Sequence, residues 1–132
     1  MQSFQLKTTA RHQMLDITSE VQKALDHVDV ENGLCVVYCP HTTGAIAINE
    51  NADPDVVHDV LLWYTRNVPK KVTGFQHGEG NSDSHIQSTM VGPSQTLIIE
   101  KGRLVLGRWQ GIFFCEFDGP RTRTVHLQFI GQ

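Results

Sequence analysis

The sequence lacks several features that would point to a membrane or to nucleic acid. No apolar run approaches the roughly 20 residues that a bilayer-spanning helix needs. The first residues, 1–7, lack the apolar core of a secretory signal peptide. Positive charge is scarce, because 11 Lys and Arg residues face 14 Asp and Glu residues, for a net charge of −3. We therefore expect a cytoplasmic protein that binds neither a membrane nor a nucleic acid.

Cysteine pairs and standard nucleotide motifs are also missing. The three cysteines form no Cys-x-x-Cys pair. Cys35 and Cys39 lie in one apolar run and Cys115 in another, which indicates buried, reduced thiols. The chain contains no Walker loop, no Gly-x-Gly-x-x-Gly element and no nucleophile elbow. These absences argue against an ordinary nucleotide-binding fold and against a serine triad.

The patterns that are present predict one domain over residues 1–132, a length typical of a single core. Alternating or continuous apolar runs predict strands at 4–7, 34–39, 43–49, 96–100, 104–106, 109–117 and 122–130. Turn residues such as Lys101-Gly102 separate the later strands. We expect an α+β fold with a mostly antiparallel sandwich or barrel-like sheet and about three short helices.

Three segments favour those helices. Ser19 and Gln22 form a candidate capping box before apolar residues at helical spacing. Asp53-Pro54 is a strong helix start, because an acidic N-cap precedes proline at the first helical position. A third helix over about 84–90 would end at Gly92.

Histidines mark the candidate site. His41 lies in the turn between two predicted strands, and His77 and His85 bracket a glycine-rich stretch. Imidazole ligands suit Zn, Cu, Fe or Ni, and three protein ligands with one open position are the catalytic pattern. The spacing matches no standard zinc motif, so a surface loop with incidental histidines stays open as the alternative.

Two further groups could take part. Asn49 and Glu50 end an apolar strand, where a carboxylate often faces a site, whereas Asp53 is explained as an N-cap. Arg121 and Arg123 follow a turn near the end of a sheet and suit phosphate recognition, although they could equally be ordinary charged-turn residues.

Several segments, taken in their order along this chain, resemble those of the YjbQ-like family, also called the secondary thiamine-phosphate synthase family. The resemblance covers essentially the whole chain. It rests on His41-Thr42-Thr43, the segments 49–55 and 77–81, Ser84-His85-Ile86, Gly102-Arg103-Leu104, and the segments 107–112 and 116–121. Position 108 is often threonine in that family, so Arg108 is a poor candidate for a shared role.

The resemblance implies a compact α+β fold, a homotrimer and a pocket built around the three histidines. It implies a weak synthase reaction that joins hydroxymethylpyrimidine pyrophosphate to thiazole phosphate and releases pyrophosphate. His41, His77 and His85 would then be metal ligands or acid–base groups, with Glu50 as a carboxylate partner. The candidate ligand- and phosphate-binding residues are Thr42, Asn49, Asn81, Arg121 and Arg123.

The expected metal is Zn or a similar ion at the histidines. Glu50, Asp53 and Glu79 could hold Mg²⁺ accompanying a pyrophosphate substrate. A three-histidine centre is softer than Mg²⁺ prefers, which favours a transition metal there. Two alternatives remain: a trimeric protein that binds a metal or ligand without catalysis, and an interaction protein with neither metal nor chemistry.

Overall fold

The computed structural model describes all residues, 1–132. Eight strands and three helices follow one another along the chain: β1 (Gln2–Lys7), β2 (Gln13–Asp16), α1 (Thr18–Asp26), β3 (Gly33–Tyr38), β4 (Gly44–Glu50), α2 (Pro54–Asn67), α3 (Ser82–Val91), β5 (Ser94–Glu100), β6 (Arg103–Leu104), β7 (Gln110–Glu116) and β8 (Thr122–Gly131).

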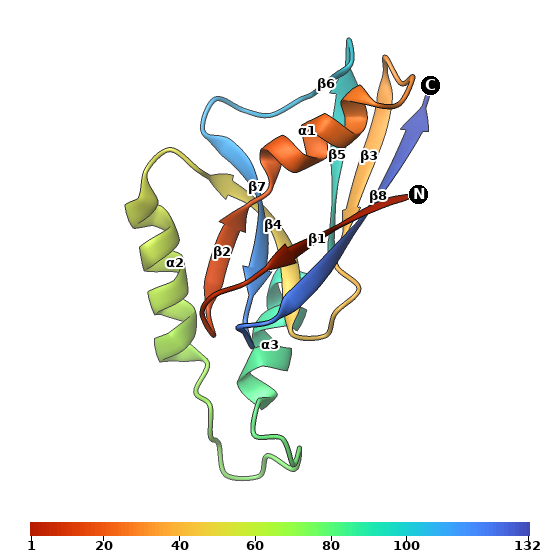
Figure 1. The fold of residues 1–132 in the computed structure, drawn as a ribbon. Helices are drawn as coiled ribbons and strands as arrows, with labels where there is room; N and C mark the ends of the chain where they lie inside the picture. The colour runs from red at the N-terminus through yellow and green to blue at the C-terminus, as the bar shows by residue number, and fades with distance from the viewer.

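The strands form two antiparallel sheets, as Figure 1 shows. A five-stranded sheet has the order β1-β8-β3-β5-β6 and curls into a half-barrel, and a three-stranded sheet has the order β2-β7-β4. Helix α1 packs Val21 and Leu25 into a core that includes Val37 of β3, Leu97 of β5 and Phe114 of β7. The expected α+β fold with antiparallel sheets and three helices is confirmed.

The start of α1 differs from the expected capping box. The N-cap residue is Ile17, and neither Ser19 nor Gln22 caps the helix. Asp16 takes that role instead, because its Oδ1 accepts hydrogen bonds from the Thr18 amide at 2.9 Å and from the Thr18 hydroxyl at 2.6 Å. The capping-box prediction was therefore wrong, since a carboxylate one residue before the cap reaches the first free amide.

The predicted start of α2 is confirmed. Asp53 is the N-cap, its Oδ1 accepts from the Asp55 amide at 2.9 Å, and Pro54 opens the helix. No residue of α2 is fully buried, although Val57 and Tyr64 pack against a small second core of Ala45, Phe113, Cys115 and Phe117. The helix therefore covers the three-stranded sheet only loosely.

All three cysteines are buried and unpaired, as expected. Burial raises the pKa of Cys35 to about 12 and that of Cys115 to about 12. These thiols therefore stay protonated at neutral pH and act as small apolar side chains.

Helix lengths bear on the membrane question. The longest helix, α2, has 14 residues. None of the helices is long and apolar enough to cross a membrane.

Candidate functional site

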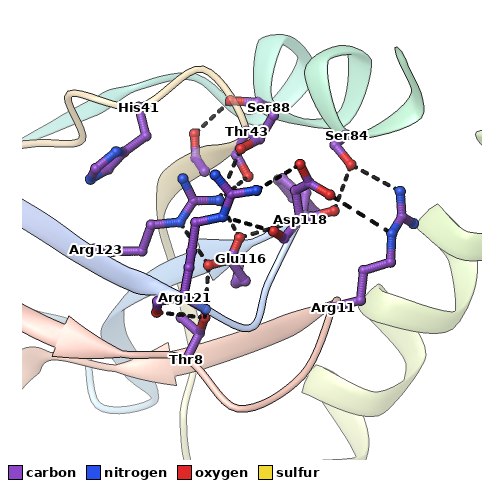
Figure 2. A network of polar contacts seen from close by, with 12 residues as sticks. Thr8, Arg11, His41, Thr43, Ser84, Ser88, Glu116, Asp118, Arg121 and Arg123 are labelled. Atoms are coloured by element: carbon purple, nitrogen blue, oxygen red, sulfur yellow. Dashed lines mark hydrogen bonds and ion pairs between the residues drawn. The ribbon is translucent and has the colours of Figure 1, made fainter. Parts of the chain in front are cut away.

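One end of the molecule gathers most of its buried polar side chains (Figure 2). Here the loops 8–12, 39–43 and 117–121 meet the first turns of α3, and we call this region the loop end. Side-chain hydrogen bonds join the segments: Ser84 Oγ donates to the Phe117 carbonyl at 2.7 Å, and the Arg121 amide donates to Thr8 Oγ1 at 2.9 Å. The loops are thus fixed to the ends of the sheets.

A buried ion pair holds the centre of the loop end. Arg123 is 2 % exposed and Glu116 is 0 % exposed. Arg123 donates from Nε to Glu116 Oε2 at 2.7 Å and from a terminal nitrogen to Glu116 Oε1 and, at 2.9 Å, to Thr43 Oγ1. Thr8 Oγ1 also donates to Glu116 Oε2 at 2.9 Å. The charge of Arg123, expected to meet phosphate, is therefore neutralised inside the chain.

A second network surrounds Asp118. Arg11 forms two parallel hydrogen bonds of 3.0 Å with the carboxylate of Asp83 at the start of α3. Arg121 donates to the Asp118 carbonyl from Nε and to Asp118 Oδ2 from a terminal nitrogen, both at 3.0 Å. Its side chain is 49 % exposed, so the remaining donors of its guanidinium face outward and suit an oxyanion.

His41 is half-buried beside the central ion pair. Its Nε2 accepts a hydrogen bond from the Thr124 amide at 2.9 Å, which places the proton of the neutral ring on Nδ1. Burial, together with the nearby charge of Arg123, lowers the pKa of His41. At neutral pH the ring is therefore an uncharged donor through Nδ1, and it would bind a metal through Nε2 only by releasing Thr124. The neighbouring Thr42 is exposed.

His77 and His85 lie together as expected. Their ring centroids are 5.2 Å apart at an angle of 87°. Asn81 is the N-cap of α3, one helical turn before His85. It is 8 % exposed and donates from Nδ2 to Asp118 Oδ2 at 2.7 Å. Its Oδ1 is buried without any hydrogen-bond partner in the chain, so this acceptor is left unsatisfied.

Asn49 and Glu50 lie elsewhere in the chain. They end β4, whereas His41 precedes its start, and β4 pairs with β7 from Gly44 opposite Glu116 to Glu50 opposite Gln110. Six steps of about 3.3 Å place Glu50 about 20 Å from Gly44. Asn49 Oδ1 accepts from the Glu50 amide at 2.8 Å and Glu50 Oε2 accepts from the Asp53 amide at 3.2 Å. Within one chain these residues shape the turn into α2.

The three expected histidines do not form one cluster within a single chain. No group of three or more His, Cys, Asp or Glu side chains is placed to hold a metal ion. Only His77 and His85 contact each other, on a segment whose residues 69–80 are all exposed. The two imidazoles of His77 and His85 give a partial donor set that suits a borderline transition metal.

Sequence reasoning missed several residues that organise the loop end. Arg11 and Asp83 pair across 72 positions of the chain, and no local pattern announces such a contact. Glu116 and Asp118 did lie within the segment 116–121 that carries the family resemblance. That segment was the available signal for their importance, although it gave no indication of which partners they have.

The fold and the loop end define a class of small α+β proteins in which a polar network closes one end of two antiparallel sheets. The family model described as "UPF0047 protein YjbQ-like" matches residues 2–132, and the chain belongs to this family. The UPF0047 protein YugU of Bacillus subtilis is 50 % identical over 131 residues, which cover 99 % of each chain.

Two further comparisons agree. The UPF0047 protein YjbQ of Escherichia coli O157:H7 is 39 % identical over 103 residues, covering 76 % of this chain and 75 % of that protein. A crystal structure of an uncharacterised YjbQ/UPF0047-family protein from Clostridium acetobutylicum has a TM-score of 0.95 at 51 % identity, covering 98 % of this chain and 100 % of that one. None of these names states an activity, so function must be argued from the loop end.

Proposed function

We propose that this protein is an enzyme acting on phosphorylated small molecules at the loop end, and that its reaction is that of a secondary thiamine-phosphate synthase. One observation carries the proposal: the rings of His77 and His85 lie 5.2 Å apart, and Asn81, four positions before His85, leaves its buried Oδ1 without a partner. A buried acceptor without a partner is costly unless something binds there. The half-exposed guanidinium of Arg121 in the same region supports an anionic substrate.

The proposed reaction forms a bond between the pyrimidine methylene carbon and the thiazole nitrogen. It breaks the bond from that carbon to the pyrophosphate oxygen, and pyrophosphate leaves with the electron pair. Arg121 binds a phosphate oxygen through its outward donors, while Asp118 holds the guanidinium in place.

The histidine pair is the proposed metal site. His77 and His85 would hold a divalent transition metal, with Asn81 Oδ1 as a neighbouring oxygen donor. A metal bound there supplies Lewis-acid neutralisation of the leaving pyrophosphate. Since one chain brings only two imidazoles together, the third ligand in this proposal is His41 of a neighbouring copy in a homotrimer.

The homotrimer proposal has separate support. Residues 69–80 are exposed throughout and include the apolar side chains of Val72 at 44 % and Phe75 at 39 %. A second copy would cover these side chains. In a homotrimer, Glu50 of one copy could also contribute to the site of another copy, although it lies at the far end of β4 within its own chain.

The decisive experiment measures thiamine phosphate formed from the two phosphorylated substrates by the purified protein, together with growth rescue of a strain without its thiamine-phosphate synthase. His85→Ala should lower the rate by about 100-fold or more, in the range for an acid–base or metal-binding group. His58→Ala is the matched control, because His58 is exposed and bonds only to Asp59. Failure of both synthesis and rescue would overturn the substrate assignment.

Metal content and subunit mixing test the architecture. Elemental analysis of the purified protein should find a divalent metal, which His77→Ala loses and His58→Ala retains. Co-expression of His41→Ala with His85→Ala should restore part of the activity, because mixed trimers contain sites with both histidines intact. A metal-bearing trimer without turnover would instead identify the non-catalytic binding protein, and a protein purified free of metal would refute the metal site.

A further inference from the structure

A polar cavity lies far from His41, His77 and His85. It has a volume of about 470 Å³ and opens between α1 and the segment 103–106, at the opposite end of the molecule from α3 (Figure 1). Its size falls within the range of small-molecule sites, about 300–1,000 Å³. The residues that line it belong to none of the networks at the loop end.

Hydrogen bonds fix the walls of this cavity. Gln22 of α1 donates from Nε2 to the Gly102 carbonyl at 3.2 Å and accepts from the Leu104 amide at 3.1 Å. Leu104 and Leu106 pack against the main core and form an apolar side of the cavity. The space is therefore already formed before any ligand arrives, which lowers the entropic cost of binding.

The charges in the cavity are unbalanced. Lys23 and Arg103 both line it, and neither forms an ion pair within the chain. The one carboxylate in the lining, Asp16, already accepts from Thr18 and, at 3.0 Å, from Asn51 Nδ2. Two cations thus face the cavity without an ion-pair partner, against a single carboxylate.

We propose that this cavity is a binding site for a small phosphate ester. Arg103 binds two phosphate oxygens with its planar fork of donors, and Lys23 adds a second positive charge. The organic part of the ester contacts Leu104 and Leu106. The proposal does not depend on the reaction at the loop end, because no residue is common to the two sites.

The test uses phenyl phosphate as the probe and the full-length protein, with binding followed through backbone amide shifts in nuclear magnetic resonance spectra. The amides of Ser19, Leu104 and Leu106 should shift in a saturable way. Arg103→Gln and Lys23→Gln should each weaken binding by about tenfold, the loss expected for one charge-assisted contact. Arg108→Gln is the matched control, since Arg108 is exposed over the Trp109 ring at 4.8 Å and lies outside the cavity.

Binding of other small anions shows which chemical class of ligand the cavity prefers. Inorganic phosphate should bind more weakly than phenyl phosphate, because it has no group to contact the two leucines. Benzoate binding as tightly as phenyl phosphate would refute a phosphate site in favour of a carboxylate site. Equal weakening by Arg108→Gln, or shifts confined to the neighbourhood of Arg121, would overturn the proposal. His85→Ala should leave the cavity shifts unchanged, which separates this result from any failure at the loop end.

Discussion

Arg123 and Glu116 form an ion pair that is almost wholly inaccessible to water, at the point where β7 and β8 approach the loop end. Each carboxylate oxygen of Glu116 has a further donor, Thr8 Oγ1 on one and the Asp118 amide on the other. Such a pair is costly to bury but more costly to break, since loss of one partner leaves an uncompensated charge.

Glu116→Gln should therefore lower the free energy of unfolding by about 3–5 kcal/mol. The reason is that Arg123 keeps its buried charge and loses the carboxylate that neutralises it. Chemical denaturation at neutral pH measures the change. Glu100→Gln serves as the control, because Glu100 is exposed and should tolerate the same substitution. An equal loss of unfolding free energy in both variants would show that the buried ion pair does not contribute more to stability than an exposed carboxylate does.

The lowered pKa of His41 predicts a pH dependence of stability. Burial and the charge of Arg123 lower the pKa in the folded state, whereas the unfolded chain titrates near its ordinary value of about 6.5. The unfolded state then takes up the proton first, so the free energy of unfolding falls as pH decreases from about 6.5 through the folded pKa.

Replacing His41 should remove part of that dependence. His41→Gln is expected to lose less stability between pH 7 and pH 5 than the unaltered protein, as measured by urea denaturation. Some loss should remain, because burial also lowers the pKa of His12. His58→Gln, at an exposed position, should behave like the unaltered protein. Identical pH curves for all three proteins would contradict the prediction.

The fork between Arg11 and Asp83 should anchor α3. Arg11→Lys keeps the charge but loses one of two parallel hydrogen bonds, and should destabilise the protein by about 2 kcal/mol. Hydrogen exchange should increase most in α3, because Asp83 lies in its first turn. Lys7→Arg is a control for basic substitution at an exposed site. Uniform acceleration across both sheets would instead indicate a global effect.

The cap of α2 offers a local prediction. Asp53→Ala should lower the free energy of unfolding by about 1 kcal/mol, because the Asp55 amide loses its acceptor. Asp59→Ala removes a carboxylate from the same helix, where it pairs only with the exposed His58. Exposed pairs contribute little, so this control should change stability by well under about 1 kcal/mol. The ranking would be refuted if Asp59→Ala were the more damaging variant.

Features that depend on residues close together in the sequence were predicted better than features that depend on residues far apart. The start of α2 depends on adjacent residues, Asp53 and Pro54, and was predicted correctly. The contact between His77 and His85 spans a short segment that ends in one helix, and was also expected. The cap of α1 was missed because Asp16 ends β2, a strand that the sequence pattern did not predict, and its carboxylate turns back to the first amide of the helix.

Long-range arrangement was harder to predict. Glu50 and His41 are only nine positions apart, yet a straight strand places them at opposite ends of β4. Arg123 reads as a charged turn residue, but the alternation along β8 directs it into the interior toward Glu116. The partner of Arg123, Glu116, is brought to it by the way β7 pairs within the fold, and no local sequence pattern predicts that pairing.

The three native cysteines have a practical consequence. All are buried, and burial raises the pKa values of their thiols. Maleimide reagents attack the thiolate of an accessible cysteine, so the folded native chain should be nearly inert to them. Gln76→Cys, within the exposed stretch beside His77, would therefore carry a fluorophore at one chosen position without removal of any native thiol. A dye at that position would test the proposed homotrimer, because a neighbouring subunit that covered residues 69–80 would change its emission.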